Sequence, residues 1–134
     1  MIPVPGEKAS DWWANTSSED ARLAAARAGG YSEEFDLNVY FLDDIPRDVL
    51  ATAPPEQPEN GLSFEEPCPF SAMPAIPATV LAGLDDRFFP FEFQRRVSQE
   101  RLGVDARPLP GGHLLAMSHP KPLVAELVSI AQNS

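Results

Sequence analysis

The chain has 134 residues, the length of one ordinary domain, and 43% of them are apolar, which is enough to build a hydrophobic core. Asp and Glu number 20 against 10 Lys and Arg, so the net charge is −10. Such a charge repels nucleic-acid backbones and anionic membrane surfaces. We therefore expect one globular unit that binds neither nucleic acid nor membrane.

The N-terminal segment predicts a cytoplasmic protein. "MIPVPGEKASDWW" has no basic stretch followed by the long apolar run of a secretory signal, and the chain nowhere offers about 18 uninterrupted apolar residues. Its two prolines and one glycine indicate a loop of the kind that leaves an earlier element. The single cysteine, Cys68, has no His or Cys neighbour, so we expect a partly buried thiol, no disulfide, no metal and no other cofactor.

Residues 8–51 are predicted to be helical and rich in aromatic side chains. "SSEDARLAAARAG" begins with Ser17 or Ser18 as a candidate N-cap and has acidic residues in its first turn, and Gly29 with the following Gly30 is a stop signal for the helix. Trp12 and Trp13 precede this helix. They are candidates to line an apolar pocket, although aromatic side chains at helical spacing are also typical of a core.

Two further elements and a long crossing are predicted before residue 77. Phe35, Val39 and Leu42 lie three and four residues apart, which predicts a second helix that Pro46 ends while opening a short third one. The segment 53–77 holds seven of the 15 prolines and shows little periodicity. We expect it to be an irregular crossing between two layers.

After Pro77 the pattern changes to that of an α/β unit. "ATVLAG" is a short apolar run bounded by proline and glycine, as in a buried parallel strand. "PFEFQRRVSQERLG" predicts a helix, "VDARPL" a second strand, and "KPLVAELVSIAQ" a final helix with apolar residues along one face, Leu123, Leu127 and Ile130. This order implies two parallel strands with a helix between them.

Chemistry-bearing side chains follow the end of each predicted strand. Asp86 comes three residues after Gly83, and His113 follows the second strand in "LPGGH". Because the carboxyl ends of parallel strands meet at one edge of a sheet, we expect the two side chains to touch. A carboxylate that accepts a hydrogen bond from one imidazole nitrogen fixes the tautomer and leaves the other nitrogen as a general base.

The stretch "PATVLAGLDDRFFP", followed at a helix-and-strand interval by "LPGGHLLAMSHP", resembles the closing half of an α/β-hydrolase. In that family a strand ends in Gly-x-x-Asp-x-x-x-Pro, and a Gly-His motif precedes the last helix. The resemblance implies that Asp86 is the catalytic acid and His113 the catalytic base. It makes Asp85 a weaker candidate, His119 a solvated surface residue, and residues 8–51 similar to the cap of the family.

The chain departs from the family at the nucleophile. Triads of α/β-hydrolases run Ser, acid, His, with the serine in a Gly-x-Ser-x-Gly elbow. No serine of this chain has flanking glycines or follows a predicted strand, whether Ser10, Ser17, Ser18, Ser32, Ser63, Ser71, Ser98, Ser118, Ser129 or Ser134. The strands that the fold places before "IPVPGE" are missing as well. We therefore expect the chain alone to be inactive.

The predicted fold class is thus α/β, the C-terminal part of an α/β-hydrolase fold. A helical cap region and proline-rich crossing (1–77) precede a strand-helix-strand-helix part of the core (78–134). The predicted activity is hydrolysis of a small ester, thioester or amide, with an N-terminal hydrolase half as partner. The alternatives are a non-enzymatic interaction module, which pairs with a protein or with itself through unpaired strand edges, and a domain that binds a small apolar ligand.

Overall fold

The computed structural model describes residues 1–54 and 62–133, and its centre is a sheet of two parallel strands. Strand β1 (Val80–Gly83) pairs with β2 (Ala106–Leu109), with Val80 opposite Ala106 and Gly83 opposite Leu109. Helix α6 (Phe91–Leu102) connects them. The predicted strand-helix-strand order and the parallel pairing are confirmed, so the chain is of mixed α/β class.

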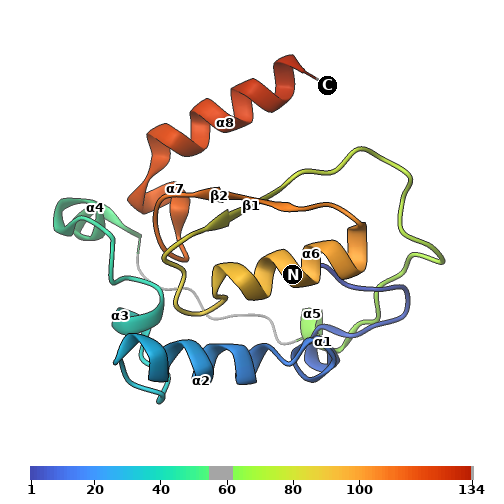
Figure 1. Ribbon diagram of the computed structural model, residues 1–134, viewed down its shortest axis with the longest axis horizontal. Helices are drawn as coiled ribbons and strands as arrows, with labels where there is room; N and C mark the ends of the chain where they lie inside the picture. Colours follow the sequence, from blue (N-terminus) through green and yellow to red (C-terminus); the bar gives the residue numbers. More distant parts are fainter. Residues whose placement is uncertain (55–61, 134) are drawn as a thin grey trace.

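Helix α6 packs against the sheet and against the N-terminal region. Its Phe93 and Val97, four residues apart on one face, are 5% and 3% exposed and form a core cluster with Trp12, which is 2% exposed. In Figure 1, α6 lies between the strands and the two N-terminal helices. The hydrophobic core therefore joins segments that lie far apart in the sequence.

Two helices, α1 (Ala9–Thr16) and α2 (Ser18–Gly29), are separated by one residue. Ser17 adopts the left-handed conformation, with φ of 53°, and the hydroxyl of Ser18 donates to the carbonyl oxygen of Trp13 at 3.3 Å. The predicted helix start is correct, but neither serine caps it through its side chain. Ser17 is the cap residue of both helices through its backbone, and its sharp turn separates them.

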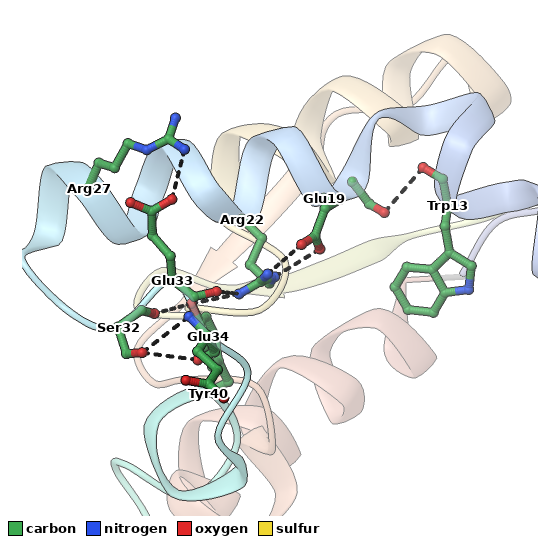
Figure 2. Close-up of polar contacts among 9 residues, drawn as sticks. Trp13, Glu19, Arg22, Arg27, Ser32, Glu33, Glu34 and Tyr40 are labelled. Atoms are coloured by element: carbon green, nitrogen blue, oxygen red, sulfur yellow. Dashed lines mark hydrogen bonds and ion pairs between the residues drawn. The ribbon is translucent and has the colours of Figure 1, made fainter.

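A buried arginine fixes the segment that follows α2. Arg22 donates to the Glu19 carboxylate, to the carbonyl oxygen of Glu33 at 2.8 Å and to the Tyr40 hydroxyl at 2.7 Å, as Figure 2 shows. The Tyr40 hydroxyl in turn donates to the carbonyl oxygen of Ser32. Tyr40 is fully buried, so this network holds the chain between α2 and the next helix against the core.

The predicted helix around Val39 is one turn long. Asp36 caps α3 (Leu37–Tyr40) by accepting from the N–H groups of Asn38 and Val39, and the chain leaves the helix at Phe41. A turn leads to α4 (Arg47–Thr52), the predicted short helix after Pro46. The apolar spacing was therefore a poor guide to the length of α3, because Phe41 turns toward His113 instead of continuing the helix.

The proline-rich crossing contains one short helix, α5 (Leu62–Glu65), and is otherwise irregular where the structure describes it. Residues 55–61 of the predicted crossing lie outside the described residues. Cys68 is half-buried, as predicted, and its backbone bonds to Gly6 and Glu7 beside an isolated antiparallel bridge between Lys8 and Pro67. The crossing thus packs along the N-terminal loop.

An almost buried ion pair fastens that N-terminal loop to α6. Both carboxylate oxygens of Glu7 accept from Arg101, at 2.5 and 2.9 Å, and the two side chains are 2% and 10% exposed. Asn15 and the N–H of Val4 also donate to Glu7. The hydrogen bond from Arg101 is the main reason why the pKa of Glu7 falls from 4.5 to about 2.

The chain ends in α7 (Leu115–Ser118) and α8 (Pro120–Gln132). Figure 1 shows α8 on the side of the sheet opposite to α6. No residue of α8 is buried, and three of its apolar side chains are about half exposed: Val124 (56%), Leu127 (50%) and Val128 (49%). Within residues 1–54 and 62–133, no helix combines the length and the apolar character needed to cross a membrane.

Candidate functional site

The carboxyl ends of β1 and β2 bring Asp86 and His113 together, as the sequence predicted. The Nδ1 atom of His113 lies 3.0 Å from Oδ2 and 3.2 Å from Oδ1 of Asp86. The Asp86 side chain is 6% exposed and that of His113 19% exposed. The carboxylate and the imidazole are therefore in hydrogen-bond contact at a nearly buried site.

Three groups besides His113 donate hydrogen bonds to Asp86. Its Oδ1 accepts from the N–H groups of Phe88 and Phe89, at 2.9 and 2.8 Å, and its Oδ2 accepts from the amide of Gln94 at 3.1 Å. An ionised carboxylate accepts hydrogen bonds and cannot donate them. His113 must therefore donate from Nδ1, so its Nε2 carries the free lone pair that a general base needs.

Aromatic rings surround His113. The ring of Phe41 stacks on the imidazole with 4.3 Å between centroids and an interplanar angle of 21°. Phe88 and Phe89 approach edge-on, at 5.3 and 5.6 Å. Because Asp86 accepts from the backbone of Phe88 and Phe89, the same short turn positions the carboxylate and walls the imidazole. This environment suits an apolar group beside the base.

The end of β1 fits closely against the glycine turn, Gly111 and Gly112, which directly precedes His113. This fit fixes the backbone from which the His113 side chain extends. A Cβ atom on Gly83 would lie 2.5 Å from the carbonyl oxygen of Gly111, so the end of β1 touches the turn backbone to backbone. Gly111 itself has φ of 116°, a backbone conformation that residues other than glycine rarely adopt. Asp85 closes the contact, since its N–H donates to the Gly111 carbonyl oxygen and its carboxylate accepts from the Gly111 N–H.

Asp85, the weaker candidate for the acid, therefore contacts the backbone of the turn and not the imidazole. Its Oδ2 accepts from the Gly111 N–H at 3.3 Å, whereas both oxygens of Asp86 lie within 3.2 Å of His113. The two adjacent carboxylates thus have different tasks in the same turn.

Sequence analysis missed Asp44, which reaches the same turn from the segment between α3 and α4. Its Oδ2 accepts from the N–H of Gly112 at 2.6 Å, directly before His113. Its other oxygen, Oδ1, is buried and has no hydrogen-bond partner among the described residues. No spacing rule points to this aspartate, because 68 residues separate it from Gly112.

His119 also differs from its expected place on the solvated surface. Its side chain is 38% exposed, and its Nδ1 lies 3.0 Å from the Ser118 hydroxyl and 3.6 Å from Oδ2 of Asp44. A Cβ atom on Gly111 would meet that same nitrogen at 2.4 Å. His119 therefore packs over the glycine turn, because the short α7 folds it back toward the strand ends.

Arg87 connects two parts of the site. It lies in the turn that carries Asp86, Phe88 and Phe89, here called the acid turn, and it binds the segment that carries Asp44. Its Nε lies 3.1 Å from the carboxylate of Asp43, and its guanidinium donates to the carbonyl oxygen of Val39 at 3.2 Å. It also lies over the ring of Tyr31, 5.0 Å from the centroid. Burial is the main cause that raises the pKa of the Asp43 carboxyl above its ordinary value, and Arg87 opposes that shift.

The two tryptophans predicted as pocket lining both contact Phe89, whose ring also contacts the imidazole of His113. Trp12 contacts Phe89 and Phe93 edge-on, and its indole N–H donates to the Ile2 carbonyl oxygen at 3.0 Å. It lines an apolar pocket of about 200 Å³ between the N-terminal loop, β1 and α6, and His113 does not line that pocket. Trp13 is half-buried against Phe88 and Phe89, which both touch His113.

No described serine is placed to act as a nucleophile for His113. The only hydrogen-bond partner of His113 in residues 1–54 and 62–133 is Asp86, so its Nε2 is unpaired there. Ser118 is the serine nearest in sequence, but its hydroxyl contacts Leu114 and the Nδ1 atom of His119. In a catalytic triad, the serine and the carboxylate contact different nitrogens of the histidine ring. Asp44 and Ser118 both approach Nδ1 of His119, so these three residues do not form such a triad.

The described part of the chain contains no group of three or more His, Cys, Asp or Glu side chains arranged to hold a metal ion. No protein-family model matches the chain, and no curated protein or solved structure matches it either. The geometry of the Asp86–His113 pair is therefore the basis for a functional conclusion.

Proposed function

We propose that Asp86 and His113 are the acid and base of a hydrolase of the α/β-hydrolase type that cleaves an ester, thioester or amide. The observation that carries the proposal is the contact between Nδ1 of His113 and a carboxylate that three other donors already hold in place. In this arrangement Nε2 removes a proton from a nucleophile, and Asp86 stabilises the imidazolium that forms.

A serine hydroxyl from outside this chain is the proposed nucleophile. The sequence contains no Gly-x-Ser-x-Gly elbow, and no described serine contacts His113. The hydroxyl oxygen attacks the substrate carbonyl carbon while its proton passes to Nε2 of His113. The imidazolium then gives that proton to the leaving alcohol, thiol or amine, and water releases the acyl group by the same two steps.

The aromatic walls of the site suit an apolar acyl group. Phe41, Phe88 and Phe89 lie around the imidazole, and Trp13 contacts both Phe88 and Phe89. Burying an apolar group against such rings stabilises the bound substrate by about 25 cal/mol for each Å² removed from water. Small esters or thioesters with an apolar acyl part are therefore the proposed substrates.

Co-expression tests this proposal directly. The chain is co-expressed with the polypeptide encoded by the neighbouring gene. The product is treated with a fluorophosphonate and its intact mass is measured. Turnover of a short aryl ester is measured in parallel. We expect an adduct on one serine of the added polypeptide, and loss of labelling and turnover with His113→Ala. Asp86→Asn should lower kcat by about 10⁴, since it leaves the wrong tautomer.

The isolated chain provides the control, with no adduct and no turnover expected. An adduct on a serine of the isolated chain would show that it supplies its own nucleophile. A fluorophosphonate-reactive serine whose labelling is the same with and without His113→Ala would remove His113 from the proposed role.

A second candidate function is that of an interaction module, and the exposed face of α8 favours it. Val124, Leu127 and Val128 are about half exposed on a helix with no buried residue. Exposed apolar patches of this kind mark contact surfaces. Size-exclusion chromatography with light scattering tests self-association: a mass of one chain for both the wild type and Leu127→Glu would contradict pairing of two copies through α8.

A further inference from the structure

We propose that residues 39–44 form a positioning element, with Asp44 as its most important side chain. This element holds the acid turn, which carries Asp86, at a fixed position relative to the base turn, which carries Gly111, Gly112 and His113. The segment lies in the N-terminal helical region, yet it makes separate contacts to the turn with Asp86 and the turn with His113. The inference rests on the proposed role of His113 as a base.

The first contact is to the backbone that carries His113. Asp44 accepts from the Gly112 N–H at 2.6 Å, a short hydrogen bond to a charged acceptor. A Cβ on Gly112 would lie 3.0 Å from Oδ1 of Asp44, so the carboxylate sits against the turn itself. Movement of Asp44 therefore moves the residue that precedes the imidazole.

The second contact is to the imidazole. The Phe41 ring covers one face of His113 with centroids 4.3 Å apart. Stacking restricts rotation of the ring about its side-chain bonds, and thus keeps Nδ1 directed at Asp86. Phe41 and Asp44 are three residues apart, so one short segment controls both the backbone and the side chain of the base.

The third contact is to the acid turn. Arg87, the residue after Asp86, binds the carboxylate of Asp43 and the carbonyl oxygen of Val39. Because the segment that binds Arg87 also binds Gly112, the distance between the acid and base turns depends on residues that belong to neither turn. The direct contacts of Asp85 with Gly111 connect the turns at a second point.

Histidine NMR on the ¹⁵N-labelled full chain provides the test, because it needs no enzymatic activity. In the wild type we expect a protonated Nδ1 and an unprotonated Nε2 at His113, with slow exchange of the Nδ1 proton. In Asp44→Ala we expect a mixture of tautomers and exchange at least about tenfold faster, since the turn opens locally more often. Asp44→Asn keeps an oxygen that accepts from Gly112, so the wild-type spectrum should return.

Asp48→Ala is the matched control, an exposed aspartate in the adjacent helix α4 that should leave the His113 signals unchanged. If Asp44→Ala does not fold, Arg87→Gln decides, because its half-exposed side chain can be changed without disturbing the core. Arg87→Gln should raise the exchange rate of the Nδ1 proton several-fold. Wild-type tautomer and exchange in both variants, or in Arg87→Gln when Asp44→Ala is unfolded, would overturn the inference.

The two proposals fail in different ways. If His113 is not a hydrolytic base, the co-expression assay is negative while the Asp44 variants still change the tautomer. If residues 39–44 do not position His113, the variants leave the NMR signals unchanged whatever the assay shows.

Discussion

Two aspartate–histidine pairs lie at the same edge of the sheet, and they differ in how the carboxylate is held. Asp86 has a donor on each oxygen besides His113, and its Oδ2 lies 3.0 Å from the imidazole. Asp44 has one oxygen without a described partner, and its Oδ2 lies 3.6 Å from His119. His119 is also twice as exposed, with 38% of its side chain accessible against 19% for His113.

The difference shows that an aspartate close to a histidine is not always held toward it by other donors. A carboxylate directs a proton to a chosen nitrogen only when its own position is fixed by other donors. Asp86 is fixed in this way because it accepts hydrogen bonds from the backbone of its own turn. Asp44 instead accepts its hydrogen bond from the N–H of Gly112. In the proposed function, the first pair carries out the chemistry and Asp44 serves as a positioning residue.

The largest expected effect is a difference in stability between variants of Asp86 and Asp44. Asp86→Ala leaves the Phe88 and Phe89 N–H groups and the Gln94 amide without their acceptor, so the free energy of unfolding should fall by about 3 to 5 kcal/mol. Asp44→Ala removes one acceptor and should cost about 1 to 2 kcal/mol. Urea denaturation measures both values, and equal losses would contradict the contrast between the pairs.

A third carboxylate, that of Glu7, makes the stability of the chain depend on pH. The pKa of Glu7 is about 2 in the folded chain and 4.5 ordinarily, so its contribution is complete above pH 4.5 and is lost as the pH falls toward 2. Glu7→Gln should therefore flatten the acid limb of the stability curve by about 2 to 3 kcal/mol. Thermal unfolding between pH 2 and pH 7 tests this, and an unchanged slope would count against the prediction.

Replacing each histidine sharpens the comparison further. His113→Ala loses the stacking on Phe41 and the hydrogen bond to Asp86, and should lower the free energy of unfolding by about 1 to 2 kcal/mol. His119→Ala should cost less than about 0.5 kcal/mol, because a half-exposed pair at 3.6 Å contributes little. Denaturant midpoints of both variants measure the difference. A larger loss for His119→Ala would reverse the ranking.

The smallest expected effect concerns Asp85, next to the acid. Asp85→Asn retains an oxygen that accepts from the Gly111 N–H, so the stability should change by less than about 0.5 kcal/mol. The tautomer of His113 should stay as in the wild type, as judged by ¹⁵N NMR. A tautomer change in Asp85→Asn but not in Asp86→Asn would exchange the roles of the two aspartates.

Much of the C-terminal fold was predictable from sequence, because local signals and packing agree there. Pro90 and Gly103 flank α6, and Phe93 and Val97 mark its buried face. The contact between Asp86 and His113 followed from the rule that parallel strands end at one edge. The face of α8 predicted from Leu123, Leu127 and Ile130 exists, but none of the three is buried and Leu127 is half exposed, since periodicity shows which side of a helix is apolar and not what covers it.

The N-terminal half was predicted less well because tertiary contacts override its local pattern. The apolar spacing of Val39 and Leu42 suggested a longer helix, but Asp36 starts α3 late and Phe41 leaves it to stack on His113. Asp44 could not be found from sequence at all. Its partner is a backbone N–H, which every residue except proline has, so no residue pattern records the contact.

The tight contact between the end of β1 and the glycine turn has a consequence for mutational tolerance. A Cβ at Gly83 would lie 2.5 Å from one backbone oxygen and 2.6 Å from another, and one at Gly111 would lie 2.4 Å from the His119 ring. In a saturation library, these two positions should therefore reject every side chain as strongly as Asp86 and His113 do. Intolerance to substitution around this site would then measure the space between backbones as much as chemistry, and a survey of variants alone would overstate how many residues take part in the proposed reaction.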